Sequence, residues 1–403
     1  MLLIGLNKTF ILSLKRAEVD YQVFLMEEEK LFKHNCFHNE ILKEVKFGKY
    51  QQSDLFMELA IKWHKEIGFD VVVPGNDYAV KAAYNFAEEI GLLTPGERAV
   101  RAFTNKYELR NECEAIGIPQ PKFSKVENVN EVKSFFKGGK IVIKPINRRS
   151  SVGVIGIEKS QDIESSWKEC VEADEKNFLA DRSFKWEYMV EDFVDGYEVS
   201  IETLVTKGKA IFHNITYKET TKEKYFVEIG HTVPAPIPLK DRDLLISVKE
   251  KLLEGLEVKA GLFHSEWKMS SEGPKLIECA ARTPGGYIPL LIEQAYNFNI
   301  NDAFVKVLQR KTVSPPLLKQ YYFTTVRFIN PPTGRLSSIK GLEIFDKLPQ
   351  IIDHEINLNI GQNITQLVNG WSRRGHYILK TKTLEEMNQT ISEIEKQLQF
   401  TVE

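Results

Sequence analysis

Apolar and polar positions along the chain follow two rhythms, one typical of strands and one typical of helices. Continuous apolar runs at residues 2–6 and 70–74 predict strands that are buried on both faces. Apolar residues recur at helical spacing in segments 9–17, 54–67 and 78–90. Strand, helix and strand in this order predict a parallel sheet covered by helices over the first hundred residues.

Strands separated by helices continue through the rest of the chain. A helix is expected over 104–116, with Thr104 as its N-cap and Gly117 as its end. The charged residues 218–224 predict a loop. Further strands are expected at 141–145, 152–157, 189–192, 198–205, 210–217 and 321–329, and further helices at 241–256 and 384–399. This mixture predicts an α/β protein, or α+β overall.

Two glutamates occupy equivalent positions of a predicted hairpin. Residues 262–269 and 275–282 both have strand character, and the five residues between them include a Gly-Pro pair. A turn centred near Glu272 would place Glu266 opposite Glu278, on one face of the sheet. Facing carboxylates are destabilising unless a cation lies between them, and Mg²⁺ prefers hard oxygen ligands. The hairpin therefore predicts a metal and phosphate site, and a solvent-facing strand pair is the alternative.

Other residues extend this candidate site. The same register places His264, Lys268 and Arg282 on the face of the two glutamates. Near the N-terminus, Asn76 and Asp77 follow a buried strand at the sheet edge where ligands bind in parallel α/β sheets. A plain helix-capping turn is the alternative for those two residues.

A loop rich in hydroxyl groups follows the strand that ends at Lys144. Ser150, Ser151 and Gly153 could close over phosphates, with backbone N–H groups and hydroxyls as donors and the lysine as a point charge. The loop lacks the P-loop and dinucleotide-binding patterns. An exposed turn is the alternative.

The connector between two later strands has the character of an adenosine-binding segment. Glu191, Phe193 and Val194 could offer polar backbone groups and apolar flanks to an adenine ring, and Glu198 could accept from ribose hydroxyls. A charged loop between strands is the alternative.

These motifs, in this order, resemble the ATP-grasp superfamily. The chain is most similar to carboxylate–amine ligases with a biotin-carboxylase-type layout, including bacterial L-amino-acid ligases, from residue 1 to about 390. The resemblance implies a Rossmann-like domain at 1–103, a central domain with an ATP lid at 104–190, and an ATP-grasp domain at 191–403 with a terminal α+β subdomain from about 312.

The resemblance also implies a role for each motif residue. It assigns the ATP phosphates to Lys106, Lys144, Ser150, Ser151 and Gly153, adenine to Glu191, Phe193 and Val194, ribose to Glu198, Mg²⁺ or Mn²⁺ to Glu266 and Glu278, catalysis to Arg282, His231 and Lys268, and substrate contacts to Asn76, Asp77, Gly285, Gly286 and Tyr287. Many members of the superfamily have a metal-binding Asn where this chain has Ala280, so a second Mg²⁺ would depend on the two glutamates, ATP oxygens and water. His231 could instead be a structural histidine, and Tyr287 a core tyrosine.

The implied reaction is ATP-dependent amide formation between L-amino acids through an acyl phosphate. One alternative is transfer of an amino acid to the phosphopantetheine thiol of a carrier protein, for which Lys222, Lys224, Arg148 and Arg149 could form a basic docking patch. A regulatory ATP-binding protein and a carboxylase are further alternatives. A homodimer is expected from the biotin-carboxylase-type layout.

Composition and charge narrow the class of protein and the kinds of partner that the chain could have. The chain has 403 residues, of which 42% are hydrophobic and 27% charged, with a formal net charge of −2. This is typical of a soluble protein of several domains, and it favours neither nucleic acid nor membrane as a partner. An N-terminus that reads as a buried strand predicts a cytoplasmic protein. Four scattered cysteines argue against a disulfide framework, and the alternating His34, Cys36 and His38 form a weak metal-ligand candidate.

Overall fold

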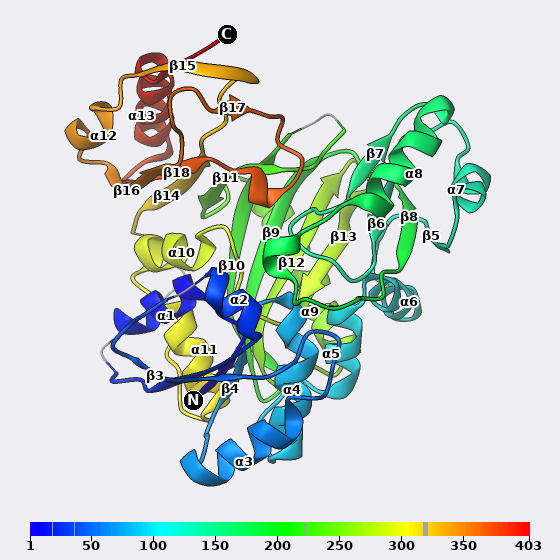
Figure 1. The fold of residues 1–403 in the computed structure, drawn as a ribbon, viewed down its shortest axis with the longest axis vertical. Helices are drawn as coiled ribbons and strands as arrows, with labels where there is room; N and C mark the ends of the chain where they lie inside the picture. The colour runs from blue at the N-terminus through cyan, green and yellow to red at the C-terminus, as the bar shows by residue number, and fades with distance from the viewer. Residues whose placement is uncertain (18, 36, 222–223, 317–320) are drawn as a thin grey trace.

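Four β-sheets organise the computed structural model, which describes residues 1–17, 19–35, 37–221, 224–316 and 321–403 (Figure 1). The first sheet has the order β3-β2-β1-β4, and all its neighbouring strands are parallel. Its elements are β1 (Leu2–Ile4), α1 (Lys8–Lys15), β2 (Val23–Glu27), α2 (Glu29–His34), β3 (Leu42–Phe47), α3 (Met57–Ile67), β4 (Val72–Pro74), the 3₁₀ turn η1 (Asp77–Ala79) and α4 (Val80–Glu89). The predicted parallel sheet is thus confirmed.

Glycines let the ends of β1 and the edge strand β4 approach each other. A Cβ atom on Gly75 would lie 1.8 Å from the carbonyl oxygen of Gly5, which no other residue type could tolerate. Because β1 and β4 pair in parallel, this approach occurs at their carboxyl ends. It delivers Asn76 and Asp77 to that edge of the sheet.

A small antiparallel sheet of order β5-β8-β6-β7 forms a separate lobe on the right of Figure 1. Its helices α7 and α8 pack against it around a core that includes Val132, Ile143 and Ile163. The elements are β5 (Phe123–Val126), α7 (Val129–Phe135), β6 (Ile141–Pro145), β7 (Ile155–Ile157), η2 (Ser160–Asp162), α8 (Ile163–Glu172), η3 (Lys176–Phe178) and β8 (Tyr188–Asp192). We call this lobe the lid.

The central sheet has eight strands in the order β13-β12-β9-β10-β11-β14-β18-β16, with all neighbours antiparallel. Its strands are β9 (Tyr197–Thr206), β10 (Lys209–Thr220), β11 (Glu228–Val233), β12 (Gly261–Ser270), β13 (Gly273–Ala280), β14 (Phe323–Phe328), β16 (Ile351–Ile356) and β18 (Gly375–Thr381). The associated helices are α5 (Glu97–Thr104), α6 (Lys106–Ile116), α9 (Leu239–Gly255), α10 (Ile288–Tyr296) and α11 (Ile300–Leu308).

The C-terminal region lies at the upper left of Figure 1. It adds a three-stranded sheet of order β17-β15-β19. Its other elements are α12 (Ile344–Lys347), β15 (Gly334–Lys340), β17 (Asn363–Ile364), η4 (Gly370–Ser372), α13 (Leu384–Gln397) and β19 (Gln399–Val402). Because β14, β16 and β18 belong to the central sheet, the region after about 312 is joined to the rest by main-chain hydrogen bonds.

Two local expectations were wrong. The helix expected over 104–116 is α6, which ends before Gly117 as expected, but Asn105, not Thr104, caps it, because the Asn105 side chain accepts from the N–H groups of Tyr107 and Glu108. The loop expected at 218–224 begins later, since β10 runs to Thr220. Lys222 and residue 223 lie outside the described residues.

The predicted pairing of the two glutamates is confirmed, although the turn differs. Ser270 pairs with Gly273, so the turn is centred half a residue before Glu272. An irregularity after Glu266, where Trp267 pairs with Leu276, restores the pairing of Glu266 with Glu278.

Candidate active site

A cavity of about 340 Å³ lies where the lid, the central sheet and the N-terminal sheet meet. Every site residue expected from the sequence lines it except Gly153 and Tyr287. The lining residues among those expected are Asn76, Asp77, Lys106, Lys144, Ser150, Ser151, Glu191, Phe193, Val194, Glu198, His231, Glu266, Lys268, Glu278, Arg282, Gly285 and Gly286. Residues from all three predicted regions therefore meet in one cavity.

The two paired glutamates present carboxylates to this cavity, each balanced by a lysine. Lys106 lies 2.9 Å from Glu278, and Lys218 lies 2.6 Å from Glu266. The described residues contain no group of three acidic, His or Cys side chains able to hold a metal alone. Two carboxylates completed by phosphate oxygens and water are the donor set that Mg²⁺ commonly uses. The residues present therefore fit Mg²⁺ that binds together with a nucleotide.

A buried network fixes the orientation of Glu266. His264 contacts Glu266 at 3.3 Å through Nε2 and Glu202 at 2.9 Å through Nδ1. Glu202 is fully buried and also accepts from Ser200, Asn214 and Thr216. A buried hydrogen-bond network of this kind holds the Glu266 carboxylate in one orientation.

Lys218 neutralises three glutamates that come from three different strands. Its ammonium lies 3.1 Å from Glu198, 2.5 Å from Glu228 and 2.6 Å from Glu266. Burial alone would lower the pKa of Lys218, but the three carboxylates outweigh it and hold that pKa well above its ordinary value. Glu198, the expected ribose ligand, is thus engaged by Lys218 on one side.

A second buried ion cluster lies beneath the expected phosphate site. Glu191 pairs with Lys144 and also accepts from Arg110, whose nearest nitrogen is 2.9 Å away. Arg110 has no exposed surface, and burial of the unpaired charges would be costly. The Glu191 carboxylate therefore neutralises Lys144 and Arg110 and is not available to adenine. Adenine would contact the residues around Glu191 instead.

Aromatic rings flank the expected adenine position. Phe193 stacks on Phe226 with centroids 5.7 Å apart, and Lys268 lies 4.7 Å from the Phe193 ring. The Phe193 N–H donates to the carbonyl of Lys140 at 3.0 Å, so this amide is not free for adenine. That part of the expected backbone contact is wrong.

The loop after Lys144 closes the cavity by contacts with the rest of the protein. Ser151 donates to the carbonyl of Phe226 at 3.1 Å, and the N–H of Gly370 donates to the carbonyl of Ser150 at 3.1 Å. Gly153 instead faces α8, because a Cβ there would lie 3.0 Å from the carbonyl of Cys170. Gly153 therefore shapes the loop without lining the cavity.

Charged residues at the N-terminal sheet mark the other part of the cavity. Arg282 forms an ion pair with Asp77 at 2.8 Å. Burial would raise the pKa of Asp77, but Arg282 and other cations lower it below its usual range. Asn76 Oδ1 is buried and has no hydrogen-bond partner, which suits a polar ligand.

His231 lies on β11. Its Nδ1 lies 2.9 Å from the carbonyl of Gly286, and a Cβ on Gly286 would lie only 2.3 Å from His231. Tyr287 points away from the cavity and stacks on His376 with centroids 4.2 Å apart. Tyr287 is therefore a partly buried, packed side chain that does not line the cavity.

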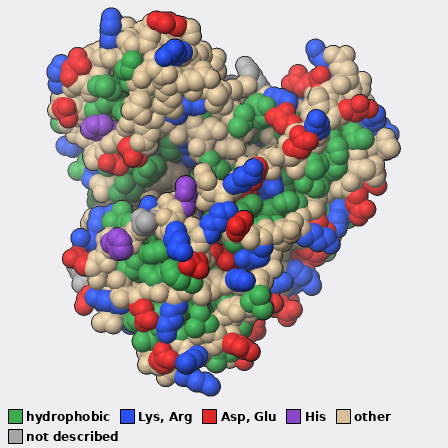
Figure 2. All heavy atoms as spheres, viewed as in Figure 1, with side chains coloured by type: hydrophobic (Ala, Val, Ile, Leu, Met, Phe, Trp, Pro, Cys, Tyr) green, Lys and Arg blue, Asp and Glu red, His purple; other side chains and the backbone are tan. Residues whose placement is uncertain are grey.

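The described members of the basic patch expected for a carrier protein do not gather on one exposed surface. Arg148 is buried, Arg149 lines the cavity, and Lys224 pairs with Glu169, while Lys222 lies outside the described residues. Acidic and basic side chains are interspersed on the face shown in Figure 2. The candidate trio of His34, Cys36 and His38 includes Cys36, which also lies outside the described residues.

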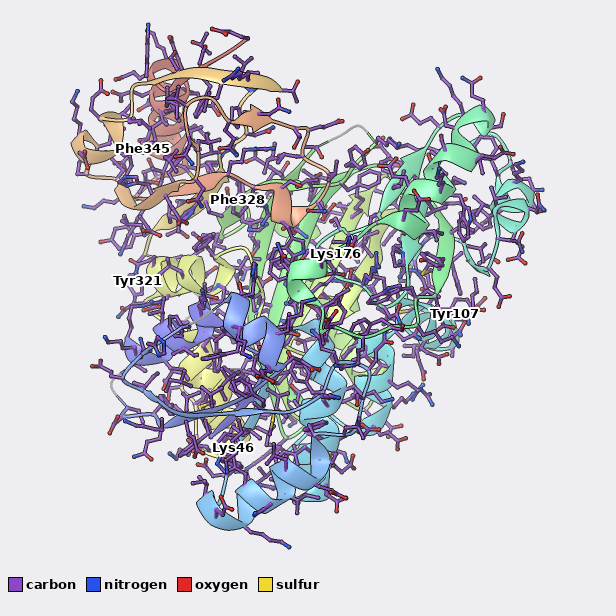
Figure 3. All side chains as sticks on the ribbon, viewed as in Figure 1. Lys46, Tyr107, Lys176, Tyr321, Phe328 and Phe345 are labelled. Atoms are coloured by element: carbon purple, nitrogen blue, oxygen red, sulfur yellow. The ribbon has the colours of Figure 1, made fainter. Side chains whose placement is uncertain are left out.

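Sequence reasoning missed several residues of the site. The cavity-lining residues not singled out beforehand for the site include Asn7, Phe226, Trp371 and Arg373. Arg373 pairs with Glu228 at 2.7 Å and lies 3.8 Å from the ring of Phe328, which Figure 3 labels. In the sequence these residues look like ordinary exposed positions of short segments. Their place in the cavity becomes visible only when segments far apart in the chain are brought together.

Comparisons with known proteins agree with this architecture. A model of the ATP-grasp domain matches residues 138–289, and a model of the L-amino acid ligase C-terminal domain 2 matches residues 327–403. The chain superposes on an L-amino acid ligase from Bacillus licheniformis with a TM-score of 0.80 and 17% identity, over 100% of this chain and 98% of that one. These matches show that the fold is that of ATP-grasp enzymes.

Two curated relatives are 24% identical to the chain. Dapdiamide A synthase of Enterobacter agglomerans aligns over 62% of this chain and 60% of its own length. Phosphoribosylamine–glycine ligase of Pyrococcus horikoshii aligns over 72% of this chain and 68% of its own length. Residues 138–289 thus match the ATP-grasp domain, and the whole chain has the fold of ATP-grasp ligases. The chain is similar to carboxylate–amine ligases of this fold, among them the L-amino acid ligases.

Among the described residues, no helix combines the length and apolar character needed to cross a bilayer.

Proposed function

We propose that the protein joins two L-amino acids through an amide bond, activating one carboxylate as an acyl phosphate and releasing ADP and phosphate. The supporting observation is that one cavity joins the paired glutamates of the central sheet to Asn76 and Asp77 of the N-terminal sheet. Trp371 and Arg373, from the segment similar to L-amino acid ligases, also line this cavity.

The residues of the chain fit the two steps of this reaction. Lys106 and Lys144 would bind the phosphates of ATP, and Glu266 and Glu278 would hold Mg²⁺. When bound, Mg²⁺ neutralises phosphate oxygens and orients them for transfer. A carboxylate oxygen of the first amino acid attacks the γ-phosphorus, and ADP leaves. The amine of the second amino acid then attacks the acyl carbon, loses a proton, and displaces phosphate.

Arg282 and the lid would assist these steps in different ways. Arg282 is held by Asp77 and adds fixed positive charge where the acyl oxygen becomes negative. The Ser150–Ser151 segment contacts Phe226 and Gly370, so it can keep water from the acyl phosphate. The contacts that close the lid over the cavity are therefore part of the proposed mechanism.

The test is release of phosphate from Mg²⁺ and ATP with each L-amino acid alone and with all pairs. Release that needs two amino acids, together with a dipeptide detected by mass spectrometry, would support the proposal and name the substrates. Release that needs a carrier protein with a phosphopantetheine arm would replace it by thioester formation. Absence of release under all these conditions would contradict amino-acid ligation.

Removal of divalent metal is expected to stop turnover. Without a cation, the carboxylates of Glu266 and Glu278 would repel the negatively charged phosphates, so excess chelator should lower phosphate release by at least about 10²-fold. Mg²⁺ should restore it, and so should Mn²⁺, which accepts similar oxygen ligands. Unchanged release in chelator would contradict the metal assignment to Glu266 and Glu278.

A further inference from the structure

Most cations that line the cavity are paired with carboxylates of the protein. The cations with such a carboxylate partner are Lys106, Lys144, Arg148, Lys218, Arg282 and Arg373. Lys268 and Arg149 differ from them, because the described residues provide neither with an ion pair. Lys268 lies over Phe193 at the expected adenine end. Arg149 remains without an assigned ligand.

Three aromatic rings from three separate parts of the fold surround the guanidinium of Arg149. It lies 5.1 Å from the ring of Tyr78 on η1, 5.6 Å from Phe178 on η3 and 5.1 Å from Trp371 on η4. Phe178 and Trp371 stack with centroids 3.6 Å apart and planes 17° apart. Figure 3 labels Lys176, which begins η3, near the middle of the molecule. The lid and the C-terminal region thus meet around this arginine.

This enclosure stabilises the cation without using its hydrogen-bond donors. A ring face attracts a guanidinium electrostatically but offers no strong acceptor in the plane of its N–H groups. Arg149 Nε is buried and has no hydrogen-bond partner. The planar fork of an arginine matches a carboxylate by two parallel hydrogen bonds. Arg149 is therefore held in place and still able to bind an anion.

Arg148, which precedes Arg149 in the same loop, has polar partners within the protein. Arg148 donates to the carbonyl of Ala173, lies 3.9 Å from Glu175 and 4.2 Å from the ring of Trp186, and is almost fully buried. Its charge is used within the lid. The two adjacent arginines of this loop therefore differ, because Arg148 has a carboxylate and a carbonyl as partners within the lid, whereas Arg149 has neither among the described residues.

The surroundings of Arg149 place it at the substrate part of the cavity. It contributes to the lowered pKa of Asp77, but Asp77 already pairs with Arg282. The buried, unpartnered Oδ1 of Asn76 follows Gly75 at the same sheet edge and could accept from an amine. An unpaired cation and an unpaired acceptor together match the two polar groups of an α-amino acid.

We propose that Arg149, held among Tyr78, Phe178 and Trp371, binds the unreacted α-carboxylate of the amino acid whose amine attacks the acyl phosphate. This inference rests on the proposed amino-acid ligation. It predicts that acceptors need a free carboxylate, and that the product keeps this carboxylate on Arg149.

The test compares each acceptor L-amino acid, taken from the pair that supports phosphate release, with its α-amide. The wild-type protein should use the free acid better than the amide by on the order of 10²-fold in kcat/KM, the scale of hydrogen bonds to a charged group. In Arg149→Met this preference should fall to about threefold or less, through a higher KM for the acid. The KM for ATP and the kcat with the amide should stay near wild type.

Two further variants separate binding from structure. Arg149→Lys keeps the charge but loses the fork, so it should keep an intermediate preference for the acid. Arg335→Met removes an exposed arginine on β15, outside the cavity, and should behave like wild type. If Arg149→Met unfolds, the acid-to-amide ratio of Arg149→Lys still decides the question.

Three results would overturn the inference. An unchanged acid-to-amide ratio in both Arg149 variants would show that Arg149 does not bind the carboxylate. A KM for ATP raised more than about tenfold with that ratio unchanged would assign Arg149 to the phosphates instead. No amino-acid-dependent phosphate release by the wild-type protein would contradict the proposed function itself, and the inference would fall with it.

Discussion

Glu278→Gln is expected to lower amino-acid-dependent phosphate release by about 10²- to 10³-fold, the scale of a lost electrostatic contribution at a reacting centre. Glu278 faces Glu266 across the hairpin and lies 2.9 Å from Lys106. An amide keeps the shape of the side chain but removes the charge that would hold Mg²⁺ and balance the lysine. Release should be measured by a coupled phosphate assay at saturating ATP and Mg²⁺.

The same hairpin provides a matched control. Glu272 lies at the turn, its side chain is 77% exposed, and it pairs only with Lys275 at 2.9 Å among the described residues. Glu272→Gln should therefore retain wild-type activity. Both variants should unfold at nearly the wild-type temperature, because Glu278 is itself 30% exposed and the substitution is isosteric. Wild-type activity in Glu278→Gln would contradict its assignment as a metal ligand.

Arg282→Ala is expected to lose amide formation far more than ATP binding. Arg282 follows the hairpin of β12 and β13 and pairs with Asp77 at 2.8 Å, so its charge lies between the two parts of the cavity. Loss of this charge should lower kcat for the dipeptide by about 10²- to 10³-fold. The KM for ATP should change by no more than about threefold, since Lys106 and Lys144 remain.

The measurement pairs dipeptide formation with ATP binding followed by calorimetry. Arg282→Lys should be intermediate, because it keeps a charge but cannot reproduce the guanidinium geometry. Asp77→Asn tests whether the ion pair positions Arg282: a smaller loss than in Arg282→Ala is expected. Equal losses of ATP affinity and of dipeptide formation in Arg282→Ala would mean that Arg282 only anchors the nucleotide.

Local sequence pattern was sufficient wherever the chemistry lies within one or two consecutive elements. The pairing of Glu266 with Glu278 follows from strand alternation and a short turn, and it holds despite a turn half a residue away from the expected centre. Lys144 at the end of β6 and Asn76 after β4 follow from buried strands that end in polar residues. Such features are determined by neighbours in the chain, so they can be read from it.

The local sequence pattern did not predict ion pairs whose partners come from distant strands. Lys218 reads locally as part of a charged loop, yet it is buried among carboxylates of β9, β11 and β12. Arg110 and Glu191 pair across 81 residues of sequence. A charged residue has no local mark that distinguishes an exposed position from a buried, neutralised one, because the difference lies entirely in which opposite charges the fold brings near.

The sequence by itself determined the class of fold, the order of the ATP-grasp motifs and the pairing of the two glutamates, because strand alternation and turn chemistry act over short distances. The tertiary structure alone decided how the charges are paired and which remain available. It turned Tyr287 away from the cavity, engaged the N–H of Phe193, and enclosed Arg149 among rings of three separate segments. Those outcomes depend on contacts between elements far apart in the chain, which no local pattern encodes.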